Sequence, residues 1–135
     1  FEIRYFVYFP ISFGMICYTQ VIKVIDNVAP EFTSCPKDTV IKSYVALGCV
    51  DDVKLSVTAS DLCAAGRTTN ADYLVFKWSI IDSATNQTIK VGYGNTLFEP
   101  FEYNRNYRVV WSVEDRCGNR TYCQQKVKHL FLLRL

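Results

Sequence analysis

The segment from residue 107 to residue 123 constrains the fold of this chain more than any other part of its sequence. It begins with large apolar residues at alternate positions, which is the two-residue period of a strand with one buried face. These residues are Tyr107, Val109, Trp111 and Val113. Turn-forming residues around Gly118 follow, with Cys117 and Cys123 on either side. The segment therefore predicts a half-buried β-hairpin.

Shorter segments elsewhere show the same alternation, and none shows the 3.6-residue period of a helix. The clearest are Val53–Ala59 and Leu74–Ile80, which polar turn residues separate from their neighbours. About seven short strands over roughly 100 residues predict an all-β, two-sheet antiparallel β-sandwich, with a barrel as the alternative. The expected core residues are Leu55, Val57, Phe76, Trp78, Val109, Trp111 and Val113.

Composition supports a folded, disulfide-bonded domain. Aromatic residues make up 15% of the chain and charged residues 21%, a balance that can bury a core. The net charge of +2 comes from basic residues spread singly along the sequence, so we expect no nucleic-acid partner. Six cysteines with one histidine, without the closely paired cysteines of zinc sites, favour disulfides and an oxidising compartment.

The first 18 residues are apolar and aromatic, but they do not match a membrane segment. A spanning helix needs about 20 apolar residues, whereas this run is shorter and contains Pro10 and Gly14. A signal peptide would need a charged start, an aliphatic centre and a small-residue cleavage site. We therefore expect no membrane insertion by this domain. Because the first residue is not Met, we expect the sequence to be a fragment or a processed form.

Several short motifs mark the chain from the linker to the last strand. They are the Asp-Asn-Val-Ala-Pro of residues 26–30, Cys35 with Pro36, the Ala-Ser-Asp-Leu-Cys of residues 59–63, the Trp-Ser-Val-Glu-Asp-Arg-Cys-Gly-Asn of residues 111–119, and Cys123. Together they resemble a hyalin repeat, the HYR-type module, from Cys17 to about His129. The resemblance is nearest to the repeats of large Bacteroidetes surface proteins. It implies an immunoglobulin-like β-sandwich, distantly related to fibronectin type III domains, in an extracellular adhesion or stalk module.

A partial internal repeat predicts the domain boundaries. Cys17–Val24 aligns with Cys123–Leu130 about 100 residues further on, which is the length of one such module. Residues 17–28 are therefore expected to be the last strand of a preceding repeat and its linker, and residues 29–130 the HYR-like domain. Residues 1–16 and 131–135 do not continue the repeat, so we expect an atypical N-terminal segment and an atypical C-terminal tail.

The immunoglobulin-like strand order predicts two disulfides. Cys63 and Cys117 would end two strands at one pole of the sandwich. Cys35 would open the first strand of the domain and Cys123 the last, and those strands run side by side in that order. We therefore predict the bridges Cys63–Cys117 and Cys35–Cys123. The cysteines left without an assigned partner are Cys17 and Cys49.

Carboxylate and amide side chains are expected near the same pole, where the linker meets the domain. They are Asp26, Asn27, Asp61, Glu114 and Asp115. Oxygen ligands of this kind are what Ca²⁺ requires. The linker sequence also resembles that of cadherins, although the paired Asp-x-Asp motif of cadherins is missing. We therefore expect turn and capping roles for these residues and no cofactor, with Ca²⁺ binding as the alternative.

The sequence does not indicate catalysis. His129 is the only histidine and belongs to no nucleophile motif, and the Gly-Tyr-Gly of residues 92–94 is not a phosphate-binding loop. Trp78 and Trp111 would form a sugar-binding platform only if they were exposed. Their positions in alternating strands predict instead that both are buried.

The sequence therefore predicts a non-enzymatic, extracellular repeat module of a cell-surface or secreted protein, used for adhesion, spacing or surface display. The expected partners are neighbouring repeats in the same polypeptide and a cell-surface protein or glycan. Two alternatives stay open: a cadherin-like, calcium-dependent adhesion module, and an accessory domain of a secreted hydrolase.

Overall fold

The computed structural model describes residues 2–8, 15–23, 25–43, 51–63, 67–68 and 74–132. The regular secondary structure in these ranges consists of β-strands. The ranges contain no helix with the length and hydropathy needed to cross a membrane. The strands are β1 (Glu2–Tyr8), β2 (Met15–Val21), β3 (Glu31–Ser34), β4 (Thr39–Ser43), β5 (Asp51–Ser56), β6 (Thr58–Ser60), β7 (Leu62–Cys63), β8 (Arg67–Thr68), β9 (Val75–Asp82), β10 (Thr88–Tyr93), β11 (Thr96–Phe101), β12 (Arg105–Glu114) and β13 (Arg120–Phe131).

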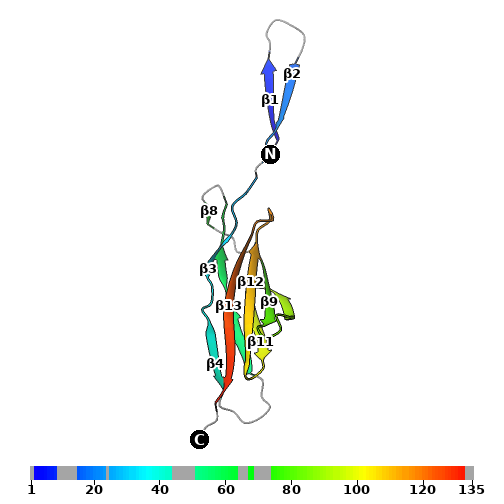
Figure 1. Ribbon diagram of the computed structural model, residues 1–135. Helices are drawn as coiled ribbons and strands as arrows, with labels where there is room; N and C mark the ends of the chain where they lie inside the picture. The colour runs from blue at the N-terminus through cyan, green and yellow to red at the C-terminus, as the bar shows by residue number, and fades with distance from the viewer. Residues whose placement is uncertain are drawn as a thin grey trace.

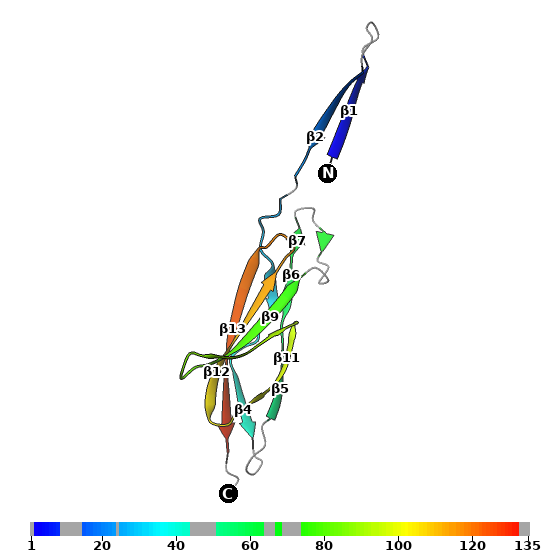
Figure 2. The same ribbon diagram turned by 90° about the vertical axis from the view of Figure 1, so that its right-hand side faces the viewer.

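Two layers of strands form a sandwich (Figure 1, Figure 2). One layer is a five-stranded sheet in the order β10-β9-β12-β13-β4, antiparallel except for β13 and β4, which run parallel. The other layer consists of the pairs β11–β5 and β3–β6. The structure thus confirms the predicted all-β, immunoglobulin-like sandwich. The linker before β3 enters at one end of the long axis, and β13 ends at the other (Figure 1).

The chain changes its sheet partner at Val57. Before this residue β5 pairs with β11, and after it β6 pairs with β3. The backbone N–H of Val57 donates to the carbonyl oxygen of Asn95 at 2.9 Å, and the Val57 side chain is buried. The alternation over Val53–Ala59 is therefore one inward-facing row of residues that belongs to two strands, first β5 and then β6.

The predicted core is confirmed in all but one position, because Phe76 is only partly buried and packs against the rest. β12 lies between β9 and β13, and its Trp111 is opposite both Trp78 and Cys123. Trp111 is 0% exposed and Trp78 is 6% exposed. Neither tryptophan can therefore offer its ring to a sugar. The buried core residues that the sequence predicted are Leu55, Val57, Trp78, Val109, Trp111 and Val113.

A disulfide joins Cys35 to Cys123, with the two Cα atoms 6.2 Å apart. Cys35 comes directly after β3, and Cys123 lies near the start of β13. The two residues are 88 positions apart in the sequence. The bridge therefore links the beginning of the sandwich domain to its last strand. Most of the core residues lie between Cys35 and Cys123 in the sequence.

The predicted Cys63–Cys117 bridge is not formed in this structure, in which Cys117 is an exposed free thiol. Among the described residues, Cys63 belongs to β7, which pairs with β8 in a separate two-stranded ribbon. Cys63 lies opposite Arg67 in this ribbon. The side chains of Cys63 and Cys17, and all of Cys49, lie outside the described residues.

The N-terminal strands form a hairpin of their own. β2 pairs with β1 along its whole length, from Glu2 opposite Val21 to Tyr8 opposite Met15. This hairpin lies apart from the sandwich (Figure 1). The expected strand beginning near Cys17 is thus present with a local partner, and its assignment to a preceding repeat stays a prediction.

Replacing Gly92 with alanine is expected to destabilise the sandwich. Gly92 lies opposite Trp78 in the β10–β9 pair, and a Cβ at Gly92 would overlap the indole, with Cη2 only 2.7 Å away. Since Trp78 is buried in the core, relief of this overlap would shift packed neighbours and cost about 1–3 kcal/mol. Equilibrium denaturation of Gly92→Ala measures the loss.

The matched control is Val91→Ala, because Val91 is the preceding residue of β10 and is exposed. It should change the free energy of unfolding by no more than about 0.5 kcal/mol. Equal losses in the two variants would contradict the close approach of Gly92 to the Trp78 ring.

Candidate metal centre at the linker end

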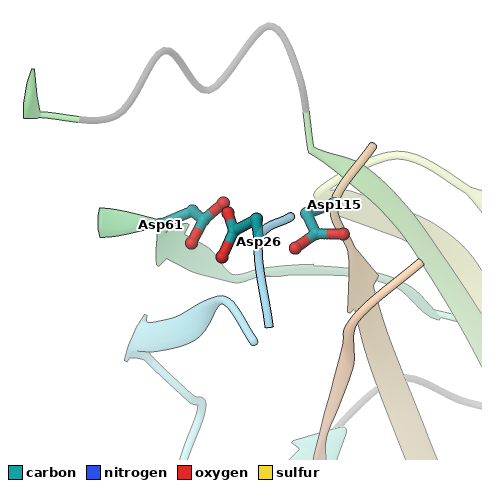
Figure 3. Close-up of side chains that lie close together, drawn as sticks. All are labelled: Asp26, Asp61 and Asp115. Carbon is teal, nitrogen blue, oxygen red and sulfur yellow. The ribbon is translucent and has the colours of Figure 1, made fainter. Parts of the chain in front are cut away.

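Three aspartates from different parts of the chain meet where the linker joins the sandwich (Figure 3). Asp26 lies in the linker, Asp61 follows β6, and Asp115 follows β12. One carboxylate oxygen from each of the three lies within 4.8 Å of the others. The strands that carry Asp61 and Asp115 end at the same pole of the sandwich, and the linker brings Asp26 to them. We call this group the aspartate cluster.

Asp115 holds together the turn between β12 and β13. Its Oδ1 accepts hydrogen bonds from the backbone N–H groups of Cys117 and Asn119, both at 2.8 Å. Gly118 has φ of +89°, a conformation that favours glycine. Burial raises the pKa of Asp115, but the hydrogen bonds from Asn119, Cys117 and Gly118 outweigh burial and hold this pKa below its usual value. Asp115 is therefore ionised at neutral pH.

Asn119 connects this turn to the linker. Its Nδ2 donates to Asp115 Oδ2 at 2.8 Å and to the backbone oxygen of Asp26 at 3.0 Å. Asp26 in turn accepts the backbone N–H of Val28 on its Oδ1 at 2.9 Å. Sequence reasoning did not place Asn119 at this site. The signal that it overlooked is the spacing of Asp115 and Asn119 around Gly118, which brings the two side chains together.

Asp61 differs from the other two aspartates in its hydrogen bonding. Its Oδ1 is buried and has no hydrogen-bond partner among the described residues. Burial, followed by the negative charges of Asp26 and Asp115, raises the pKa of Asp61 above its usual value. A carboxylate in this position is destabilised when ionised, and a proton or a cation at the cluster would relieve the repulsion.

Glu114, which was also predicted for a calcium site, does not join the cluster. Glu114 is next to Asp115 in the chain, and successive strand residues point to opposite faces. Its carboxylate instead accepts a hydrogen bond from Arg120 Nε at 2.7 Å on the outer face of the sheet. Asn27 is exposed and follows Asp26 directly in the linker, and its part in a calcium site stays a prediction.

The cluster offers a cation the hard oxygen ligands that Ca²⁺ prefers. Asp61 contributes an oxygen without a donor, which fits a ligand role. Asp115 fits less completely, because its two oxygens already accept three N–H groups of the turn. A bound Ca²⁺ would therefore depend on Asp61 and Asp26, with Asp115 adding charge and one remaining lone-pair direction.

The fold and this pole define the chain as an immunoglobulin-like β-sandwich module preceded by a linker. No family model and no curated protein matches the chain. Among solved structures it is similar to the Bacteroides ovatus mixed-linkage glucan utilization locus SGBP-B in complex with a mixed-linkage heptasaccharide, with a TM-score of 0.50 and 18% sequence identity. The likeness covers 78% of this chain and 25% of that one. It shows a shared fold, and the hyalin-repeat resemblance stays a prediction.

Substitutions at Asp61 and Asp115 are expected to have opposite effects in the metal-free protein. Asp61→Asn should stabilise the fold near neutral pH, because it removes a charge whose pKa is raised. Asp115→Asn should cost about 1–3 kcal/mol, because it deprives the partly buried N–H donors of the turn of an ionised acceptor. Denaturant unfolding in EDTA, followed from neutral pH into acid, measures both effects.

The pH dependence has a definite sign for each residue. The raised pKa of Asp61 means that wild type regains stability as the pH falls through that pKa, so the gain in Asp61→Asn should shrink there. The lowered pKa of Asp115 means that its contribution is present above about pH 3.9 and is lost as the pH falls further. A loss of stability in Asp61→Asn at neutral pH would contradict the repulsive role of Asp61.

Proposed function

We propose that this chain is a non-enzymatic, extracellular spacer module of a cell-surface or secreted protein, one that holds neighbouring domains at a set distance for adhesion or surface display. The observation that carries the proposal is the Cys35–Cys123 disulfide. The linker enters the sandwich just before Cys35, and the chain leaves it through the strand that contains Cys123. Tension along the chain would therefore pass through the covalent bridge.

The bridge limits how far such a module can stretch. If the domain unfolded under tension, the residues between Cys35 and Cys123 would stay inside the closed loop and would not lengthen the tether. Without the bridge, the 88 positions between the cysteines would add about 30 nm at full extension. A module with this bridge keeps its length whether or not its core is intact, which suits a spacer.

Other features support an extracellular, non-catalytic role. A disulfide between the first and last parts of a domain is typical of proteins in oxidising compartments. His129 is 0% exposed and its Nδ1 lies 2.7 Å from the carbonyl oxygen of Phe101, so it is held in the core. The structural neighbour, SGBP-B, was solved in complex with a mixed-linkage heptasaccharide. We include a glycan among the partners of this chain.

Single-molecule stretching between the linker and the end of β13 tests the spacer role. The oxidised protein should give unfolding steps about 30 nm shorter than the reduced protein, because reduction releases the 88 positions. The double variant Cys35→Ser/Cys123→Ser should behave like the reduced wild type under all conditions. Steps of the same length before and after reduction would remove the basis of the proposal.

A calcium-dependent module of the cadherin-like kind is the second candidate, and the aspartate cluster favours it. Asp26 belongs to the linker, whereas Asp61 and Asp115 belong to the sandwich. A cation among them would neutralise the charge that raises the pKa of Asp61. It would also fix the linker against the domain, so that successive modules keep one orientation.

Thermal unfolding with Ca²⁺ and with EDTA tests the calcium role. At a Ca²⁺ concentration of about 100 times the dissociation constant, wild type should gain about 2.7 kcal/mol over the EDTA sample. Asp61→Asn should lose this response while being more stable than wild type in EDTA. Glu114→Gln is the control, since Glu114 lies outside the cluster, and it should keep the response. The same midpoint for wild type in Ca²⁺ and EDTA would exclude this role.

A further inference from the structure

The solvent-facing side of the five-stranded sheet carries one continuous row of side chains across four strands. Tyr93 lies opposite Lys77, Lys77 opposite Ser112, and Ser112 opposite Tyr122. Residues opposite each other on neighbouring strands point to the same side of a sheet. The alternate positions of β9, β12 and β13 are buried, so this row faces solvent. It crosses the sheet from β10 to β13.

The same face is strongly basic. The described residues bring two carboxylates to this face. Glu114 accepts a hydrogen bond from Arg120. Asp38, at the edge of the sheet, accepts the backbone N–H of Lys126 at 2.8 Å. The aspartate cluster lies at the linker end instead. We call this surface the outer basic face. Its basic residues, all outward in the register, are Lys42, Lys77, Arg108, Arg120, Lys126 and Lys128.

Two exposed tyrosines lie at the two ends of the row that crosses the outer basic face. Tyr93 is 73% exposed and Tyr122 is 63% exposed. Lys77 Nζ lies 6.0 Å from the centre of the Tyr93 ring, and Arg120 Nη1 lies 3.5 Å from the Tyr122 hydroxyl. These contacts hold each ring beside a positive charge. The two tyrosines are three strand spacings apart, about 14 Å, a distance that a short oligosaccharide can span.

A hollow of about 170 Å³ lies beside Tyr93, over β9, β12 and the start of β13. Its polar lining offers hydroxyl, ammonium and guanidinium groups that can bond to ligand oxygens. The hollow and the rings together provide flat apolar contacts next to charged donors. The residues that line it are Val75, Lys77, Tyr93, Ser112, Glu114 and Arg120.

We propose that the outer basic face binds an acidic polysaccharide, a linear glycan that carries carboxylate or sulfate groups. The C–H faces of sugar rings would stack on Tyr93 and Tyr122. The acidic groups would pair with Lys77 and with the lysines of β13, Lys126 and Lys128. This site goes beyond the spacer role, and it depends only on the proposed extracellular setting.

A single-stranded nucleic acid is the other polymer that a basic sheet with exposed aromatic rings can bind. The Cys35–Cys123 disulfide favours the glycan, because it indicates an oxidising, extracellular compartment, where acidic glycans are the abundant linear polyanions. The charge of the face also separates its ligand from a neutral glucan, which would leave the lysines unpaired. The three classes of polymer can therefore be told apart by experiment.

Isothermal titration of the oxidised chain tests the proposal with four probes: polygalacturonate, chondroitin sulfate, a neutral mixed-linkage glucan and single-stranded DNA. We expect binding to at least one acidic polysaccharide, tighter than to DNA, and weaker as the salt concentration rises. Lys126→Gln/Lys128→Gln should reduce affinity about tenfold and flatten the salt dependence by about two charges. Tyr93→Ala should reduce affinity about tenfold and leave the salt dependence unchanged.

The matched control is Lys23→Gln/Lys54→Gln, which removes two exposed lysines from the linker and the opposite layer. It should leave affinity within about twofold of wild type. Equal or tighter binding to DNA, binding to the neutral glucan alone, or no binding at all would overturn the proposal. So would equal losses in the control. None of these outcomes bears on the stretching experiment, so failure of the site and failure of the spacer role are distinguishable.

Discussion

The register of β12 between β9 and β13 is the constraint on which the rest of the structure depends. It sets Trp111 opposite both Trp78 and Cys123, so the centre of the core and the disulfide lie on the same inward row. It also places Asp115 at the end of β12, where the linker arrives. A shift of one residue would turn Trp111 towards solvent and Ser112 into the core. The register of this one strand therefore determines the core, the disulfide and the linker end of the sandwich.

The last strand is held by polar contacts as well as apolar ones. Gln125 and His129 are inward-facing and almost fully buried. Gln125 Nε2 donates to the carbonyl oxygen of Lys37 at 3.0 Å and to Thr39 Oγ1 at 3.1 Å, and His129 bonds to Phe101 across the sandwich. These bonds satisfy groups that burial would otherwise penalise. They attach β13 to the parallel strand β4 and to the opposite layer.

The sequence predicted the fold and the core because alternation is a local property. Trp78 and Trp111 could be assigned to the interior from their own strands alone. The members of the aspartate cluster could be named, but their sorting required geometry, since only the pairing and the turn separate Asp115 from Glu114. The Cys63–Cys117 bridge, which the structure does not form, also depended on geometry, because the sequence does not show that β7 pairs locally with β8.

The outer basic face could not be predicted from the sequence either, because it too depends on how the strands pair. Along the sequence its lysines and arginines are scattered singly, and the net charge of +2 indicates no preference for a polyanion. They become one surface only because the register of four strand pairs aligns outward positions that are far apart in the chain. β13 contributes Tyr122, Lys126 and Lys128 to this surface, and the disulfide anchors that strand near its start. The strand that would carry tension through the module thus also presents half of the basic residues of this surface, namely Arg120, Lys126 and Lys128. A polymer bound across the outer basic face would therefore contact the strand that the bridge anchors.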